Sequence, residues 1–230
     1  MVRKADIPRH IIDTALTLAA ERGWGEISLN HIARAAKLPL SGVYGVFASK
    51  TAILAGFSRQ LDADMLAALD ADAAAAPARE RLFDVLMKRF DVLNPHKGAI
   101  ANILRDSCAD PIAAFSGLAP LCRSIAWMLE GAGIGTQGPL GLVRIKGLSM
   151  IYLSALAVWL RDESPDMAKT MAHLDKRLRQ AENCIIALRC RRRRPGPSPR
   201  RPAAPAKRGA SGFGSPWRSL ASAEPGRAGG

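Results

Sequence analysis

The residues with the clearest potential for chemistry lie in a stretch with few polar side chains. Residues 31–50 read HIARAAKLPLSGVYGVFASK, and the spacing predicts two short helices that meet at a tight turn. This is the frame of a helix-turn-helix, which places its second helix in the major groove of duplex DNA. Base edges are recognised by paired donors and acceptors, yet PLSGVYGVF contains no Arg, Lys, Asn, Gln, Asp, Glu or His. The stretch therefore predicts DNA binding in which phosphate contacts and DNA shape outweigh hydrogen bonds to bases.

Other kinds of site lack the residues they need. The four histidines are scattered over different expected helices, and no P-loop, G-x-S-x-G or dinucleotide-binding pattern occurs. We therefore expect no catalytic site, no metal and no cofactor. The four cysteines show no C-x-x-C pairing and are expected to be idle thiols: Cys108, Cys122, Cys184 and Cys190.

Three short helices are expected to position the polar-poor stretch within residues 1–58. Pro8 suits the first turn of the first helix, and Gly23 supplies its left-handed end, followed by apolar Trp24. Ser28 is a good amino-terminal cap for the second helix. The third helix is expected to begin at Pro39 or Leu40 and to carry Val43, Tyr44 and Phe47 on its inner side.

Residues 59–188 are expected to form a second, wholly helical domain, so that the predicted fold class is all-α. Pro77, Asn94-Pro95, Asp110-Pro111 and Gly131–Gly138 divide the domain into about five helices. Gly147–Leu160 is apolar on nearly every face and should be enclosed by other helices. At 14 residues this segment is too short to span a bilayer. The amino terminus lacks a signal peptide, so we expect a soluble, cytoplasmic protein without membrane insertion.

One later helix carries an apolar stripe with two open interpretations. Ser164, Pro165 and Asp166 suit a helix start. The stripe after them packs either in the core of the same chain or against a second copy in a four-helix bundle. Its members alternate by four and three residues: Met167, Met171, Leu174, Leu178, Ala181 and Ile185.

Large, polarisable side chains mark a candidate ligand pocket in the same domain. Each suits core packing by itself, whereas together they suit an apolar ligand. Residues 1–188 carry a net charge of only +3, which disfavours an anionic ligand. The candidates are Trp127, Met128, Met150, Tyr152 and Trp159.

The overall charge of +13 belongs mostly to residues 189–230, which hold 11 basic residues and one acid. Pro and Gly make up about a third of this Arg/Pro/Gly-rich segment, which predicts a disordered tail. Two other interpretations stay open: a non-specific nucleic-acid arm, and an out-of-frame extension in GC-rich coding DNA.

The amino-terminal region resembles the tetracycline-repressor (TetR) family of transcriptional regulators. The similar stretch is IIDTALTLAAERGWGEISLNHIARAAKLPLSGVYGVFASKTAILAGF, with Lys37 where the family usually has a glycine. The resemblance implies a homodimeric repressor that binds double-stranded DNA, with a small apolar or amphipathic effector moving the helix that begins near Thr51. It also favours the subunit-interface interpretation of the stripe. The family's DNA contacts fall on Ser28, Asn30, Pro39, Leu40, Ser41, Gly42, Tyr44, Gly45 and Lys50. Of these, Tyr44 and Lys50 suit phosphates, and Leu40 suits a thymine methyl.

A second resemblance leads to the alternative function. The stretch IYLSALAVWLRDESPDMAKTMAHLDKRLRQAE is similar to the carboxy-terminal region of the coenzyme Q biosynthesis accessory family. That family shares the TetR fold, and the resemblance implies an isoprenoid-lipid-binding accessory protein of ubiquinone biosynthesis that has lost specific DNA recognition. The basic tail stands where that family has an amphipathic lipid-binding helix.

Overall fold

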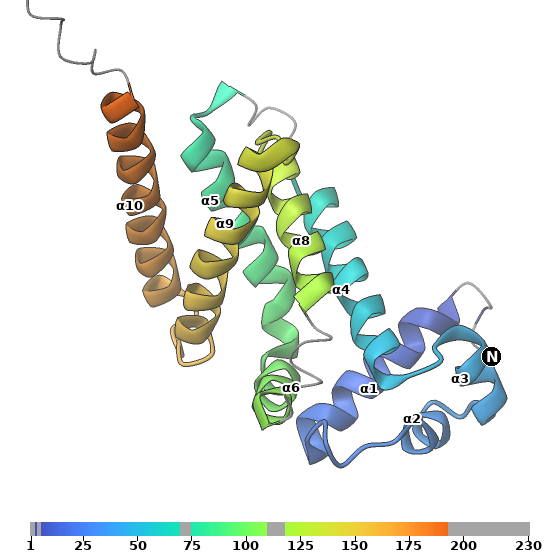
Figure 1. The fold of residues 1–230 in the computed structure, drawn as a ribbon. Coiled ribbons are helices and arrows are strands. Elements are labelled where there is room, and N and C mark those ends of the chain that lie inside the picture. Colours follow the sequence, from blue (N-terminus) through green and yellow to red (C-terminus); the bar gives the residue numbers. More distant parts are fainter. Residues whose placement is uncertain (1–2, 4–5, 70–74, 110–117, 193–230) are drawn as a thin grey trace, which may run out of the picture. The chain divides into compact units, whose positions relative to one another are not determined.

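The computed structural model describes residue 3 and residues 6–69, 75–109 and 118–192. Every regular element in these ranges is helical (Figure 1), so the predicted all-α class is confirmed. The predicted tail lies outside the described residues from residue 193 onward, while residues 189–192 continue the last helix. The elements are α1 (Ile7–Arg22), α2 (Leu29–Ala35), α3 (Leu40–Val46), α4 (Lys50–Ala67), α5 (Ala78–Leu93), a 3-10 turn η3 (Asn94–His96), α6 (Lys97–Ala109), α8 (Leu118–Gly131), α9 (Gly138–Trp159) and α10 (Ala168–Arg192).

Local signals set the ends of the first helices as predicted. Pro8 lies in the first turn of α1, and Gly23 ends the helix at φ 89°, with its N–H donating to the Ala19 carbonyl at 3.1 Å. The Ser28 hydroxyl accepts from the His31 N–H at 3.2 Å, and the His31 ring accepts from the Ser28 N–H at 3.3 Å. This reciprocal pair caps α2.

The turn between α2 and α3 has the strained conformation that the sequence predicts. Lys37 stands at φ 55°, where a residue with a Cβ costs roughly 1–2 kcal/mol more than glycine. The His10 imidazole Nε2 donates to the Ala36 carbonyl at 3.1 Å, so α1 holds the end of α2 directly before this turn. Such a conformation persists only where its surroundings fix it.

Three of the predicted interruptions divide residues 59–188, and the fourth, Asp110-Pro111, lies outside the described residues. Pro77 caps α5, and the Asn94–Pro95 step begins the 3-10 turn before α6. The glycine-rich segment separates α8 from α9, and α9 then packs against both α8 and α10. Gly141 is required in this connection, because a Cβ there would lie 1.8 Å from the Thr136 carbonyl oxygen.

Helix α9 is longer and less enclosed than predicted. It has 22 residues, and its inner side buries Leu148, Tyr152 and Trp159. Its outer side leaves Val143 67% and Met150 69% exposed, so the expectation that it is enclosed on all faces was wrong within this chain. The helix is long and apolar enough to cross a membrane, although one such helix is weak evidence for a span.

The turn before α10 is organised by Asp162, which is buried. Its carboxylate accepts from the Thr170 N–H at 2.8 Å, the Thr170 hydroxyl at 2.7 Å, and the backbone and hydroxyl of Ser164. Burial by itself raises the pKa of a carboxyl, but these hydrogen bonds hold the pKa of Asp162 well below its usual range. The helix begins at Ala168 rather than near Pro165, because Met167 takes φ 53° immediately before it.

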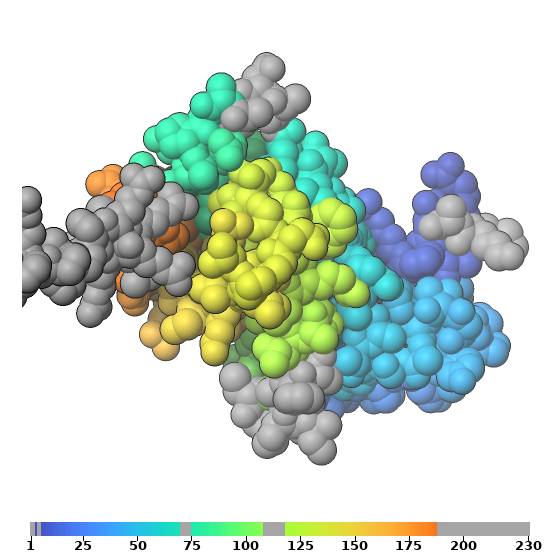
Figure 2. Space-filling model, turned by 45° about the horizontal axis from the view of Figure 1, so that its top comes forward, coloured from blue at the N-terminus to red at the C-terminus, as the bar shows by residue number. Residues whose placement is uncertain are grey.

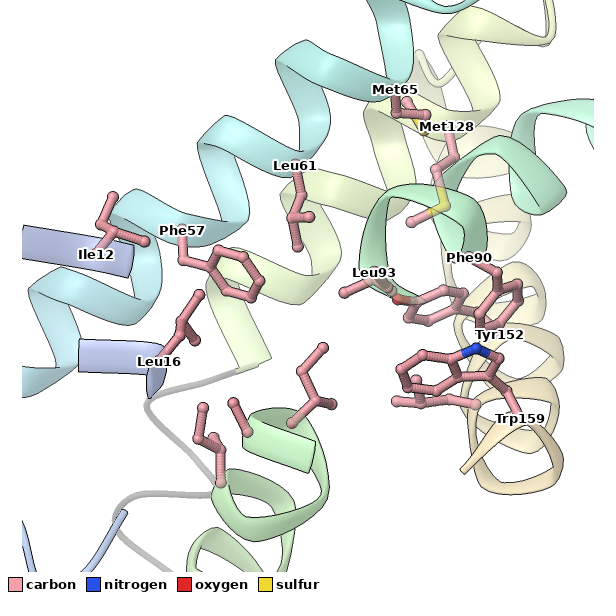
Figure 3. Packing of buried hydrophobic residues seen from close by; sticks show 14 of the residues in the cluster. Ile12, Leu16, Phe57, Leu61, Met65, Phe90, Leu93, Met128, Tyr152 and Trp159 are labelled. Carbon is pink, nitrogen blue, oxygen red and sulfur yellow. The ribbon is translucent and has the colours of Figure 1, made fainter. Parts of the chain in front are cut away.

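The core joins the two regions through α4. Phe57 on α4 lies near Ile12 and Leu16 of α1 (Figure 3), and farther along the helix Met65 lies near Met128 of α8. A helix that packs against both the amino-terminal helices and α5 and α8 can transmit a change in either region.

A buried polar cluster fixes α4 to α5 and α8. Asp62 of α4 forms an ion pair with Arg89 of α5, and both side chains are under 10% exposed. The Ser124 hydroxyl of α8 donates to Asp62 at 2.9 Å and also lies 2.8 Å from the Ser58 hydroxyl. Because a buried ion left without its partner is very unfavourable, this cluster restricts how the three helices can be arranged.

Candidate DNA-binding surface and helical ligand domain

Helix α3 presents a smooth, largely apolar outer face. Val43 and Phe47 are buried beneath it, whereas Leu40 is 49% and Tyr44 is 67% exposed. The expectation that Tyr44 lies on the inner side was therefore wrong, because its ring has turned to solvent one position along the helix from Val43. The other predicted DNA contacts of this segment, Pro39, Ser41 and Gly45, are also exposed, and Gly42 is half-buried against the Pro39 ring.

The two predicted DNA contacts at the start of α2 differ in whether their side chains are available to contact DNA. Asn30 is exposed, and its side chain makes no hydrogen bond within the described residues. Ser28 is exposed too, but its hydroxyl is occupied by the helix cap to His31. Of these two residues, Asn30 is therefore the one whose side chain is available to a phosphate or sugar.

Lys50 is partly engaged inside the protein. Its ammonium donates to the Trp24 carbonyl at 2.5 Å and lies 4.9 Å from the centre of the Trp24 ring. Burial lowers the pKa of Lys50, and the negative charge of Asp106 opposes that shift. A phosphate contact by Lys50 would have to replace the contact with Trp24.

Helix α6 forms hydrogen bonds with the end of α1 and with the loop after it. The Asn102 amide donates to the carbonyls of Ala19 and Ala20 at 2.9 and 3.2 Å. The Asp106 carboxylate accepts from the Gly25 N–H at 2.7 Å. These contacts attach the loop that carries Trp24, and through it Lys50, to the second domain.

The charge around α3 suits a polyanion. From residue 27 to residue 58 the sequence contains three basic residues and no acid. Arg34 near the end of α2 and Lys37 in the turn after it are exposed, and Lys50 begins α4. A positively charged surface attracts duplex DNA independently of its sequence.

The five candidate pocket residues do not converge. Met128, Tyr152 and Trp159 are buried, whereas Trp127 is 48% and Met150 is 69% exposed. The exposed pair lies on the outer sides of α8 and α9, which lie side by side on the face shown in Figure 2. The candidates therefore divide between the core and the surface.

Two of the buried members, Tyr152 and Trp159, form an aromatic cluster with Phe90 of α5 (Figure 3). The Phe90 ring stacks on Tyr152 with centroids 5.6 Å apart and tilts against Trp159 at 5.8 Å. The Lys97 ammonium lies 5.4 Å from the Trp159 ring centre and donates to the Asp162 carbonyl. The indole Nε1 is buried and has no hydrogen-bond partner among the described residues.

Two surface grooves lie away from this cluster and are lined mostly by charged residues. One, of about 310 Å³, lies between α5 and α10 beside Arg79, Phe83 and Asp175. The other, of about 300 Å³, lies beside Leu69, Met87 and Lys88. Neither includes a residue predicted for the pocket.

The stripe on α10 faces its own chain. Met167, Leu174 and Leu178 are buried where α10 packs on α9 and α5. Met171 and Ala181 are partly buried, and only Ile185, at 50%, is well exposed. Exposed large apolar side chains occur on α9 instead, among them Leu142, Val143, Met150 and Leu153.

The sequence analysis did not identify several residues that fix the positions of the helices around the candidate site. Asp106, Asp62 and Arg89 act across sequence separations of 81 and 27 residues, so no local pattern identifies them. Charged residues at apolar register positions of α4 and α5 were the available signal for the last two. In the described part of the chain, no three His, Cys, Asp or Glu side chains gather as metal ligands would.

Comparison with known families gives two separate matches. Residues 11–56 match the model of the bacterial regulatory proteins of the tetR family, and residues 145–185 match the COQ9 model. No curated protein sequence matches the chain.

Solved structures resemble the whole described fold. The TetR transcriptional regulator from Nitrosomonas europaea is 24% identical with a TM-score of 0.64, over 76% of this chain and 98% of that one. A TetR transcriptional regulator from a Rhodococcus species is 17% identical with a TM-score of 0.56, over 77% of this chain and 97% of that one. The chain therefore has the fold of TetR regulators, with a tetR-family match over its helix-turn-helix and a COQ9 match over its last helices.

Proposed function

We propose that this protein is a DNA-binding transcriptional regulator that acts as a homodimer. The observation that carries the proposal is the helix-turn-helix itself, in which a capped α2, a left-handed Lys37 and an exposed α3 face occur in a segment without acids. The match of residues 11–56 to the tetR family supports it. A soluble, cytoplasmic repressor is the form that fits these features.

The outer face of α9 is the surface proposed for dimerisation. Val143, Gly147, Met150 and Ala157 are exposed at the helical spacing of a bundle seam, while Ser154 in the same register is half-buried and lies 3.1 Å from the His173 ring of α10. Leu142 and Leu153 at the edge of this face are also exposed. Exposed apolar side chains gathered along one helix are typical of a protein interface, and the exposed Lys146 lies among them. This assignment replaces the α10 stripe, whose main residues are buried within the chain.

The effector is proposed to enter between α5 and α9. Phe90, Tyr152 and Trp159 meet there, so a flat apolar ligand would replace one ring contact with another. A hydrogen-bond acceptor on the ligand would satisfy the buried indole N–H. Displacing α5 would disturb its ion pair with α4 and so reach the DNA-binding head.

Selection from random duplex DNA tests the proposal. The full chain is used at physiological salt with an excess of unlabelled polyanion, since the basic tail attracts any duplex. We expect enrichment of an inverted repeat, as a symmetric dimer requires. Leu40→Glu adds a negative charge to an exposed position and should abolish the enrichment without unfolding the protein. Equal enrichment by this variant would contradict the proposal.

The match of residues 145–185 to COQ9 favours a second candidate, an isoprenoid-lipid-binding accessory protein of ubiquinone biosynthesis. The matched region contains Trp159, the Asp162 turn and the exposed apolar residues of α9. Mass spectrometry of lipids that copurify with the protein tests this candidate. A bound polyprenyl lipid that is lost in Trp159→Ala would support it, and protein free of lipid would contradict it.

A further inference from the structure

We infer that α3 recognises its DNA site chiefly through the 5-methyl groups of thymines in the major groove. The inference rests on the proposed DNA-binding function and names the feature of the duplex that the surface fits. It follows from the order of side chains around the exposed half of α3, from the absence of side-chain volume at its centre, and from the charge around it.

The side chains of α3 divide by helical spacing. Val43 and Phe47 point inward and are buried. Ser41 and Gly45, four residues apart, lie on the opposite side and form the part of the helix that enters a groove first. Leu40 with Tyr44 flanks this ridge on one side, and Val46 lies beyond it on the other.

The ridge allows close approach to the bases. A Cβ added at Gly45 would meet no protein atom within 4 Å, so this position is open to whatever the helix docks against. Backbone without a side chain can approach a ligand closely. A methyl group on the groove floor would then reach the Leu40 side chain, which is 49% exposed.

Few side chains of α3 can recognise bases through hydrogen bonds. Ser41 and Tyr44 supply the only side-chain polar groups on α3, and neither forms the two-point contacts that distinguish base pairs best. Apolar side chains distinguish thymine from cytosine through its methyl group. Arg34 at the end of α2 and Lys37 in the turn before α3 are exposed and supply positive charge for phosphate contacts.

The size of the effect follows from burial. Each methyl group that moves from water into an apolar contact increases the affinity of the complex roughly fourfold. Two contacted methyls in one half-site therefore correspond to about fifteenfold, and a symmetric dimer applies the factor twice.

The experiment compares two random duplex pools of the same design, one made with thymidine and the other with deoxyuridine, which lacks only the methyl group. The full chain selects from each pool, and the sequence enriched with thymidine is rebuilt in both forms for affinity measurement. The basic tail contributes equally to both, because it contacts the backbone and not the methyl. Leu40→Ala is measured beside Leu118→Ala, a leucine of α8 with 50% exposure that serves as a matched control.

We expect a motif with thymines at fixed positions and roughly fourfold weaker binding for each contacted methyl removed. Because the substitution changes Leu40 in both protomers of the proposed dimer, Leu40→Ala should reduce the difference between the two forms about fifteenfold, while Leu118→Ala should leave it unchanged. Specific binding of equal affinity in both forms would overturn the inference and leave the regulator proposal standing. Enrichment of no motif in either pool would overturn both.

Discussion

Replacing Arg89 by methionine should strongly destabilise the protein, because it leaves the Asp62 carboxylate buried without its ion pair. Both side chains are under 10% exposed, and the remaining hydrogen bond to Asp62 comes from Ser124 at 2.9 Å. Removing one partner of a buried pair costs about 3–5 kcal/mol. For a chain of this size, such a loss lowers the melting temperature by roughly 10 °C.

The double variant Asp62→Leu/Arg89→Met should recover most of this loss. Two apolar side chains of similar volume can replace a buried pair at little net change in stability, and the Ser58–Ser124 hydrogen bond at 2.8 Å remains to satisfy both hydroxyls. We therefore expect the free energy of unfolding to return to within about 1 kcal/mol of the wild type. The two single effects would then be far from additive.

Urea denaturation followed by circular dichroism at one protein concentration measures these differences, because dimer stability depends on concentration. Arg79→Met provides the matched control on the same helix. Arg79 pairs with Asp175 at 2.9 Å and Glu182 at 3.4 Å, but the carboxylates are 33% and 49% exposed. Its loss should cost less than about 1 kcal/mol. Equal effects of the two arginine variants, or additive effects of the pair, would refute the role of the buried cluster.

Three further perturbations test other parts of the structure. Burial and the nearby charges of Arg177 and Lys176 lower the pKa of His173. As the pH falls, His173 is therefore protonated in the unfolded chain before it is protonated in the folded chain, and the free energy of unfolding should decrease below about pH 6.5. Urea denaturation of His173→Gln should show a smaller decrease. Gly56→Ala should destabilise the head by roughly 1–3 kcal/mol, since its Cβ would lie 2.7 Å from the Phe47 ring, and thermal melts that match the wild type would contradict this. Met150→Glu should yield monomers in sedimentation, because it places a charge in the centre of the proposed α9 interface; a persistent dimer would exclude that face.

Local chemistry explains which parts of the fold could be predicted from the sequence. The end of α1 at Gly23, the cap at Ser28 and the break at Asn94–Pro95 depend on neighbouring residues and appear as predicted. The left-handed conformation of Lys37 was implied by the resemblance to the TetR family, which usually has a glycine at this position.

The details of the site depend on contacts between distant segments. Lys50 turns toward Trp24, 26 residues away, although its position alone suggested a free phosphate contact. The apolar pattern of α10 showed that one side is covered but not which element covers it. In α9 apolar residues occur on all sides, so the sequence could not distinguish its buried side from its exposed side.

The most direct test of the central claim measures the affinity of the full chain for its selected duplex and for a scrambled duplex across a range of salt concentrations. Added salt weakens the phosphate contacts equally for both duplexes, whereas it does not weaken the contacts to bases. The account predicts parallel salt dependences separated by a constant preference for the selected sequence, and loss of that preference in Leu40→Glu. Equal affinities for the two duplexes at every salt concentration would contradict the claim that α3 recognises DNA sequence.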